Sequence, residues 1–352
     1  MDYKNLILKI FKQLVDIAYA KDEKGVQFKL KEYTHTIKAI TDYDGCISSI
    51  DTVKQILIQS GKKNPKSTLI KIEEIMNTGT LAYYEKEKDN PIVQAVGNFS
   101  KIYAFGPKKS KDLYTLFKIT NISELHQLIK NNNNKYEGKS ILNKKQLIGL
   151  QYHEDLQKRI PYQEMLEYQT FLSHHLDVFN KKNNTCMKLS INGSFRRKCS
   201  DSGDIDVLIT EKGDIIHRKE WISYLQKIGF IKEILADGNN KFMGICKLTE
   251  SSVPRHIDII ETKSHHYPFG ILYFTGSGGF NTYMRTLSLQ KGYSLNEYEF
   301  SDKKTKVPIS SQEIQKKIQK DTFETEQDIF TFLDIDYVLP ENRNKITISK
   351  IN

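Results

Sequence analysis

Two aspartates stand close together in the stretch GSFRRKCSDSGDIDVLIT, residues 193–210. Side chains two positions apart on a strand share a face, so Asp204 and Asp206 would lie about 7 Å apart while their apolar neighbours point into a core. Asp258 alternates with isoleucines in the same way in RHIDII. If the two strands are neighbours, three carboxylates converge and their repulsion requires cations. Such oxygen ligands suit Mg²⁺, and paired ions of this kind serve phosphoryl or nucleotidyl transfer.

Residues that could hold phosphates come just before these aspartates. Gly193 and Ser194 form a turn whose backbone N–H groups can donate to phosphate oxygens. Arg197 brings a planar guanidinium that suits outer phosphates, and Ser202 with Gly203 gives a second turn. An isolated Asp-x-Asp would more simply be an exposed strand edge. The combination of turns, arginines and a distant strand aspartate favours a site for a highly charged ligand.

The elements that would position this site change in character along the chain. Residues 1–88 show the apolar spacing of helices, as in NLILKIFKQLVDIAY, FKLKEYTHTIKAI and TLIKIEEIMNTGTL. Residues 89–158 hold further short helices, and the polar insert NNNNKYEGKS at 131–140 predicts a solvated loop. From residue 159, a helix in PYQEMLEYQTFLSHHLDVF precedes strand patterns in MKLSIN, IDVLIT, KFMGICKL and RHIDIIET. The tail from residue 263 mixes a glycine-rich turn with a helix in FNTYMRTLSLQKG.

The composition favours a globular chain with an anionic partner. The chain has 352 residues, of which 38% are hydrophobic, enough for two or more domains. Its formal charge of +10 points first to nucleic acid, and a lysine-rich surface kept for solubility is the alternative. The four cysteines lack the spacing of a zinc site or a disulfide framework, which fits a reducing intracellular setting. No apolar run reaches the length of a membrane helix, so we expect a soluble protein.

Together these motifs resemble those of the family X DNA polymerases. KRIPYQEML resembles the entry to the family's palm, GSFRRKCSDSGDIDVLIT its nucleotide-binding signature, and KFMGICKL and RHIDII the following palm strands. GILYFTGSGGFNTYMRTLSLQKGYSLNEYEF resembles the segment that encloses the nascent base pair. The likeness is strong over 149–300, continues in EQDIFTFLDIDYVLPENR, and is weaker but in register over 28–150. The lysine, asparagine and isoleucine bias resembles that of a viral member.

This resemblance implies an α+β fold in four parts. We expect a helical lyase-like domain that binds 5′ ends over 1–88 and a helix-hairpin-helix DNA-binding subdomain over 89–158. A nucleotidyltransferase palm with a mixed β-sheet would follow over 159–262. A small C-terminal α/β subdomain that binds the nascent base pair would span 263–352.

The resemblance also implies roles for the site residues. Asp204, Asp206 and Asp258 would bind two Mg²⁺ ions, which Mn²⁺ could replace, with Asp258 nearest the primer hydroxyl. Asn281 would reach the minor-groove edge of the incoming base and Arg285 that of the template, where contacts check geometry rather than identity. The incoming deoxynucleotide would be held by Arg159, Gly193, Ser194, Arg197, Ser202, Gly203, Tyr273, Phe274 and Gly276.

Three positions depart from the family pattern. His256, counted among the DNA-binding positions, stands where relatives carry an arginine beside the third aspartate, so imidazole protonation would influence the orientation of Asp258. Gly278 replaces an aspartate near the incoming base, and Ile260 replaces an arginine that restrains the open enzyme. The sequence therefore does not predict whether this chain switches between an open and a closed conformation.

The alignment implies a second activity in the N-terminal region. Lys71 falls on the Schiff-base nucleophile of a 5′-deoxyribose phosphate lyase, and Lys29 and Tyr33 fall on its 5′-phosphate-binding positions. An amine attacks a sugar aldehyde well only with a depressed pKa, and Lys71 borders an apolar stripe. However, GKKNPKS replaces the first hairpin, and Tyr83 stands where the lyase pocket has a lysine. Binding of a 5′-phosphate without lyase chemistry, or a simply solvated lysine, stays open.

The stretch YAFGPKKSK resembles the family's second helix-hairpin-helix. There Ala104, Gly106 and Lys108 would meet a DNA phosphate through backbone N–H groups, with a monovalent cation as a further ligand. Lys109 and Lys111 would add positive charge. Such binding is independent of sequence and weakens steeply with salt. A plain basic loop that caps a helix is the alternative.

The expected function is that of a monomeric, template-directed DNA polymerase that fills short gaps in base excision repair. Its partners would be gapped or nicked double-stranded DNA and deoxynucleoside triphosphates, without a membrane. It would act in the nucleus or, for a viral member, in the viral factory or virion. No exonuclease signature is evident, so we expect no proofreading. A template-independent or RNA-directed nucleotidyltransferase and a gapped-DNA-end binding protein without catalysis are the alternatives.

Overall fold

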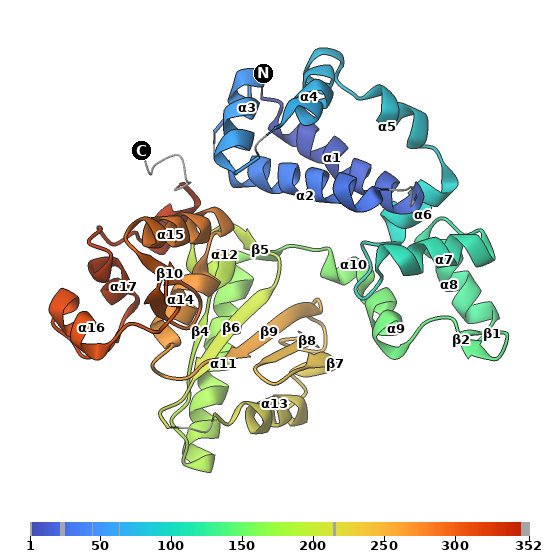
Figure 1. The fold of residues 1–352 in the computed structure, drawn as a ribbon. Coiled ribbons are helices and arrows are strands. Elements are labelled where there is room, and N and C mark those ends of the chain that lie inside the picture. Colours follow the sequence, from blue (N-terminus) through green and yellow to red (C-terminus); the bar gives the residue numbers. More distant parts are fainter. Residues whose placement is uncertain (1, 22–24, 44, 63, 214–215, 346–352) are drawn as a thin grey trace. The chain divides into compact units, whose positions relative to one another are not determined.

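The computed structural model describes residues 2–21, 25–43, 45–62, 64–213 and 216–345. They form two compact units, Met1–His153 and Glu154–Asn352 (Figure 1), which are described separately. The finer division into four parts stays a prediction, and residues 346–352 of the expected C-terminal subdomain lie outside the described ranges. No helix in these ranges is long and apolar enough to cross a lipid bilayer.

Helices form the first half of the N-terminal unit, as the apolar spacing predicts. They are α1 (Lys4–Lys21), α2 (Val26–Asp42), α3 (Ile50–Gln59), α4 (Lys66–Thr78) and α5 (Ala82–Glu87). Their apolar faces share one core that includes Phe11, Tyr33 and Ile72. Helix α4 ends at Gly79, whose φ of 77° is a left-handed conformation that glycine adopts without strain.

The second half of this unit has its own core. Its elements are α6 (Pro91–Phe99), α7 (Pro107–Phe117), α8 (Ile122–Asn131), β1 (Lys135–Tyr136), β2 (Lys139–Ser140) and α9 (Lys144–Gln151). The insert at 131–140 is exposed, as expected, but it is a β-hairpin rather than a plain loop. Glu137 and Gly138, the two residues between the strands, both have positive φ and close the turn.

A five-stranded mixed sheet lies at the centre of the C-terminal unit, in the order β4-β6-β9-β8-β7. Strands β6 and β9 run parallel, and the other neighbours are antiparallel. The strands of this sheet are β4 (Lys188–Ile191), β6 (Ile205–Thr210), β7 (Ile231–Asp237), β8 (Lys241–Cys246) and β9 (Arg255–Glu261). Upstream, α10 (His153–Leu156) precedes β3 (Ile160–Pro161), which pairs with β5 (Asp201–Ser202).

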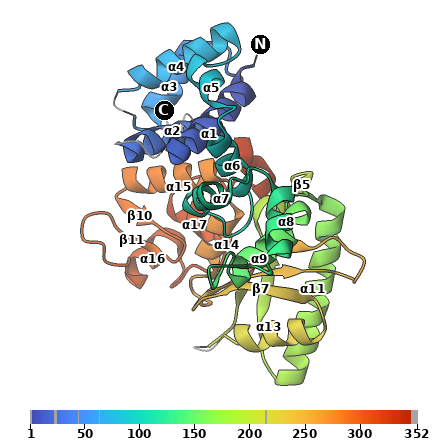
Figure 2. The same ribbon diagram turned by 90° about the vertical axis from the view of Figure 1, so that its right-hand side faces the viewer.

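One face of the sheet is apolar and is covered by α11 (Tyr162–Asn183) and α13 (Arg218–Lys227), as Figures 1 and 2 show. Ile205 and Val207 of β6 are buried there in one core with Tyr168 of α11 and Trp221 of α13. The alternation predicted for IDVLIT is therefore confirmed. It leaves the intervening Asp206 on the opposite face of the sheet.

Helices and two short strands complete the C-terminal unit. They are α12 (Gly193–Arg196), α14 (Tyr267–Thr275), α15 (Gly278–Gln290), β10 (Tyr293–Leu295), β11 (Phe300–Asp302), α16 (Ser311–Ile318), α17 (Glu326–Phe332) and the 3₁₀ helix η1 (Pro340–Lys345). A phenylalanine-rich core, in which Phe300 and Phe332 stack at 4.9 Å, joins several of these elements. Helix α14 also contacts the site face of the sheet, where Gly270 lies against Leu208 of β6.

Candidate active site

Two of the three aspartates lie on neighbouring strands. The parallel register of β6 and β9 places Asp206 directly beside Asp258. Asp204 lies just before β6 rather than on it, because Gly203 and Asp204 form the bend between β5 and β6. The motifs alone do not show that these two strands are neighbours. The strand order of the sheet shows that they are.

The carboxylates repel one another. The pKa of Asp206 is raised to about 7, first by burial and then by the charges of Asp204 and Asp258. Gly193 packs directly against this carboxyl group. Its φ is 58°, and a β-carbon at this position would collide with Asp206 Oδ2. Only glycine therefore satisfies both the backbone conformation and the available space.

Asp258 is 6% exposed and contacts two basic side chains. Lys241 Nζ, at the start of β8, lies 2.6 Å from Asp258 Oδ2, and His256 Nε2 lies 3.6 Å from Asp258 Oδ1. The motif RHIDII indicates His256 but not Lys241, whose place follows from the antiparallel pairing of β8 with β9. The adjacent Arg255 instead donates to both carboxylate oxygens of Glu164 at 2.7 Å, which ties β9 to α11.

The donor set fits a divalent cation. Within the described ranges, no three His, Cys, Asp or Glu side chains are arranged as a metal-binding cluster, and Asp258 is paired with Lys241. However, Asp258 Oδ1 is buried and accepts no hydrogen bond from the described residues. The charges of Asp204 and Asp258 both act on Asp206, and ionised carboxylates are the kind of ligand that a hard dication prefers. An ion there would compete with Lys241 for Asp258.

An open pocket of about 490 Å³ adjoins Asp204 and Asp206. This volume lies within the range usual for small-molecule sites. Eleven predicted site residues line the pocket, and they are Arg159, Gly193, Ser194, Arg197, Gly203, Asp204, Asp206, Tyr273, Phe274, Gly276 and Asn281.

The two turns expected to bind phosphates are held by short polar contacts. Ser194 Oγ donates to Ser202 Oγ at 2.9 Å, and Ser202 is 1% exposed, so it supports Ser194 from behind. Arg159 pairs with Asp201, with 2.6 Å between Nη2 and Oδ1. A β-carbon on Gly203 would lie 2.9 Å from Arg159 Nη1, so this glycine lets the arginine approach the turn.

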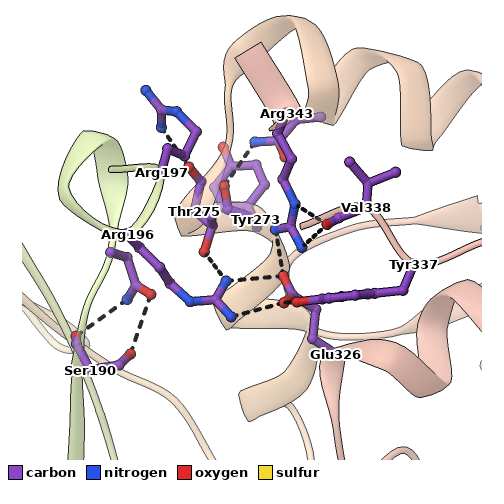
Figure 3. A network of polar contacts seen from close by, with 11 residues as sticks. Ser190, Arg196, Arg197, Tyr273, Thr275, Glu326, Tyr337, Val338 and Arg343 are labelled. Atoms are coloured by element: carbon purple, nitrogen blue, oxygen red, sulfur yellow. Dashed lines mark hydrogen bonds and ion pairs between the residues drawn. The ribbon is translucent and has the colours of Figure 1, made fainter. Parts of the chain in front are cut away.

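Arg197 is held at the pocket by residues from the far end of the chain. Its Nη1 donates to Thr275 O at 2.6 Å (Figure 3), and its Nε donates to Asn344 Oδ1 at 2.8 Å. Burial lowers the pKa of Arg197, but a guanidinium stays charged in proteins. Asn344 belongs to none of the sequence motifs, so the sequence alone does not indicate that it contacts Arg197.

The neighbouring Arg196 pairs with a buried acid instead. Figure 3 shows its guanidinium beside Glu326, with 2.9 Å between Nη2 and Oε2. Glu326 also accepts from Arg343 Nη1 at 2.6 Å and from Tyr337 Oη at 2.8 Å. Burial raises the pKa of Glu326, but hydrogen bonds from Arg343 and Arg196 bring it below its usual value. The two motif arginines thus differ: Arg197 faces the pocket, and Arg196 joins α12 to α17.

The other end of the pocket is formed where α14 ends. The sequence YFTG, residues 273–276, is the C-terminal end of α14, and the Gly276–Ser277 peptide bond is cis. Asn281 Nδ2 donates to Tyr273 O at 2.8 Å. The guanidinium of Arg285 lies 5.1 Å from the centroid of the Tyr273 ring and 3.6 Å from Glu297 Oε2. Tyr273 thus links the two side chains expected to read the base pair.

In the N-terminal unit, Lys71 of α4 lies near Tyr33 of α2. Lys71 Nζ is 6.0 Å from the centroid of the Tyr33 ring and donates to Ser67 O at 3.2 Å. Tyr33 lines a small pocket together with Lys29 and Tyr83. The structure therefore places the three predicted lyase-site residues on α2 and α4.

Glu32, a residue that the motifs do not indicate, holds the end of the segment GKKNPKS against α2 through its side-chain contacts. Glu32 Oε1 accepts from Ser67 Oγ at 2.7 Å and from Thr68 Oγ1 at 2.6 Å, and it lies 3.5 Å from Lys62 Nζ. Burial lowers the pKa of Lys62. This cluster links α2 to the start of α4.

The residues expected to form a helix-hairpin-helix contact lie at and just before the start of α7. Ala104 has a φ of 64°, Gly106 is the N-cap residue, and Lys108 is exposed. Lys109 turns inward and donates to Ile141 O, and burial lowers its pKa. The expectation that Lys109 adds charge to a DNA-binding face stays a prediction, and its ammonium group is already used in this internal hydrogen bond.

A mixed sheet that carries aspartates on two parallel neighbouring strands, beside a Gly-Ser turn, defines the nucleotidyltransferase class. Comparison with known families gives matches to the DNA polymerase beta palm over residues 159–263 and to the DNA polymerase beta thumb over 270–344. The chain belongs to the family X DNA polymerases.

Curated relatives agree with this assignment. The chain is 24% identical to DNA polymerase lambda of Arabidopsis thaliana over 97% of its length and 62% of the relative's. It is 28% identical to DNA polymerase lambda of Rattus norvegicus over 97% of its length and 56% of the relative's. It is also 24% identical, over 77% of its length and 52% of the relative's, to a type-X family protein of Schizosaccharomyces pombe, pol4. The chain thus spans about half to six tenths of these relatives.

Proposed function

We propose that this chain is a template-directed DNA polymerase that fills short gaps in DNA. The observation that carries the proposal is the register of Asp206 beside Asp258, next to a pocket bordered by Gly193 and Arg197. Membership of the family X DNA polymerases supports the same activity.

The chain's own residues have distinct tasks in this reaction. Asp204, Asp206 and Asp258 would hold two divalent ions, Mg²⁺ or Mn²⁺, which would activate the primer 3′-hydroxyl and stabilise the leaving pyrophosphate. Gly193 and Ser194 would donate to the triphosphate, and Arg197 would offset charge that develops on its outer phosphates. The three carboxylates would hold the ions, and Gly193, Ser194 and Arg197 would orient the triphosphate, so that the primer hydroxyl and the α-phosphate would meet in a fixed geometry.

Templating would depend on the pocket end near Tyr273. Its backbone oxygen holds Asn281 and its ring lies under Arg285, so one residue aligns both groups with the minor groove of the new base pair. The backbone at Gly276 would crowd a 2′-hydroxyl, which favours deoxynucleotides. These features argue against a template-independent or RNA-directed enzyme.

The expected partners are gapped or nicked double-stranded DNA and deoxynucleoside triphosphates, bound by a monomer. The formal charge of +10 supports binding to such a polyanion. The Ala104–Gly106 turn and Lys108 would contact a backbone phosphate, with a monovalent cation nearby. We expect action in the nucleus or, for a viral member, at the site of viral replication.

Extension of a primer across a one-nucleotide gap tests this proposal. Wild type should extend the primer, and Asp258→Ala should lose about 10³-fold in rate because a charged ligand of the reacting centre is gone. Asp177→Ala is a matched control, since Asp177 is exposed on α11. Equal extension by Asp258→Ala would overturn the mechanism. Extension without a template strand, or with ribonucleotides as readily, would favour the alternatives.

We propose 5′-deoxyribose phosphate lyase activity as a second function, because Lys71 Nζ lies 6.0 Å from the centroid of the Tyr33 ring. Borohydride should trap the wild-type chain on a preincised abasic site, and Lys71→Ala should not be trapped. Lys66→Ala, an exposed lysine of the same helix, is the control. Trapping that persists in Lys71→Ala would remove Lys71 from this role and leave 5′-phosphate binding alone.

A further inference from the structure

The end of the described chain reaches the phosphate-binding loop. Asn344 lies in η1, 147 residues from Arg197, yet its Oδ1 accepts a hydrogen bond from Arg197 Nε at 2.8 Å. Its Nδ2 donates to Cys199 Sγ at 3.4 Å. Both ends of the amide are therefore used on the loop between α12 and β5, which fixes the orientation of the side chain.

The segment that carries Asn344 is itself anchored. The preceding Arg343 is fully buried, pairs with Glu326 and donates twice to Val338 O at 3.0 Å (Figure 3). Its guanidinium also lies 5.0 Å from the centroid of the Phe280 ring. A residue that follows such an anchor has little freedom, so the Asn344 side chain is held in place before any ligand binds.

Two acceptors then define how Arg197 faces the pocket. Asn344 takes Nε, and Thr275 O takes Nη1 at 2.6 Å. A guanidinium has five donors in a fixed plane, so fixing one edge directs the remaining donors. Arg197 lines the pocket that contains Gly193 and Ser194, and its remaining donors serve that space.

A second contact between η1 and the loop is weaker. Lys198 Nζ lies 3.1 Å from Glu341 Oε1, but the lysine side chain is 63% exposed. Exposed pairs of this kind contribute little. The half-buried, charge-assisted hydrogen bond between Arg197 and Asn344 is the stronger of the two contacts between η1 and the loop.

We propose that Asn344 is a positioning residue that aims Arg197 at the outer phosphates of the incoming nucleotide. The proposal rests on the proposed polymerase function and adds a residue outside every motif of the site. Asn344 acts through Arg197 and does not touch the substrate.

Calorimetric titration of the full chain with a deoxynucleoside triphosphate and Mg²⁺ tests this without requiring turnover. Asn344→Ala and the bulkier Asn344→Leu should each weaken binding about 5- to 10-fold, since one of two anchors of a charged donor is lost. Asn342→Ala, an exposed neighbour on η1, should bind as wild type does. In an Arg197→Ala background, Asn344→Ala should cause no further loss.

Thermal unfolding separates positioning from folding. Both Asn344 variants should keep the wild-type melting temperature of the C-terminal unit, reported by fluorescence of the single tryptophan, Trp221. Wild-type affinity in Asn344→Ala, or an undiminished effect of Asn344→Ala in the Arg197→Ala background, would overturn the proposal. A failure of wild type to extend a gapped primer is a different result, which would remove the polymerase function instead.

Discussion

At Gly193, two constraints meet on one residue. Its φ of 58° favours glycine, and a β-carbon would collide with the carboxyl group of Asp206. Gly193→Ala should therefore lower gap-filling activity at least about 100-fold, because a displaced metal ligand costs several kcal/mol at the reacting centre. The measurement is the single-turnover rate on gapped DNA.

Gly292→Ala provides the matched control. Gly292 also has a positive φ, 92°, but a β-carbon there meets no atom within 4 Å. Both substitutions should cost about 1–2 kcal/mol of stability through backbone strain. If Gly292→Ala loses as much activity as Gly193→Ala, strain rather than displacement of Asp206 explains the loss.

Single residues differ in how far the sequence indicates them. Asp206 and Arg197 belong to a motif whose residue types alone indicate its chemistry. Lys241 and Asn344 do not, since their contacts with Asp258 and Arg197 depend on strand pairing and on the path of the C-terminal segment. Lys109 shows the reverse case, in which a basic run suggests a DNA contact but one member is used internally.

At the scale of elements, alternation predicts β6 and β9 because their inward isoleucines and valine are regular. It does not indicate β7, whose register with β8 shifts between Ile231 and Glu233 and again between Ile234 and Ala236. Bulges of this kind interrupt the two-residue period. The hairpin at 135–140 is likewise hidden, because its composition is that of a loop.

The start of α7 offers a test with two adjacent lysines. Lys108→Ala should weaken binding to gapped DNA about 2- to 3-fold and reduce the salt dependence by about one ion, because an exposed phosphate contact is lost. Lys109→Ala should leave DNA affinity nearly unchanged and lower stability by about 1 kcal/mol, because the Ile141 carbonyl loses its donor. Fluorescence anisotropy at several salt concentrations and thermal unfolding measure the two effects. The opposite assignment of effects would contradict the observed direction of Lys109.

The junction of α12 and α17 depends on Glu326. Glu326→Gln should destabilise the C-terminal unit by about 3–5 kcal/mol, since Arg343 and Arg196 would keep buried charges without a counter-ion. Glu324→Gln, a 66% exposed acid, should change stability by no more than about 0.5 kcal/mol. Urea unfolding followed by Trp221 fluorescence measures both.

This difference should depend on pH in a defined direction. The folded state lowers the pKa of Glu326 from 4.5, so its stabilisation is present above that value and is lost as the pH falls through the folded value. Wild type and Glu326→Gln should therefore converge in stability on acidification below about pH 4.5. A difference that stays constant down to pH 3 would show that the charge of Glu326 is not the cause.

For the whole molecule, composition and motif order indicate a basic, multi-domain α+β chain, and the structure has two compact units in which helices precede the mixed sheet. The catalytic fold could be predicted well because its motifs lie within short stretches of 149–300. The N-terminal site could be predicted less well, since Glu32, Lys62 and Ser67 replace a glycine-rich hairpin with side-chain contacts that no local pattern encodes.

The central claim is that carboxylates of β6 and β9 hold the divalent ions of nucleotidyl transfer. Electron paramagnetic resonance of Mn²⁺ tests it directly, with the 352-residue chain, gapped DNA whose primer lacks a 3′-hydroxyl, and the matching deoxynucleoside triphosphate. Wild type should bind two Mn²⁺ ions per complex, and Asp206→Asn combined with Asp258→Asn should abolish this binding while DNA affinity is retained. Two tightly bound ions in that double variant would contradict the account.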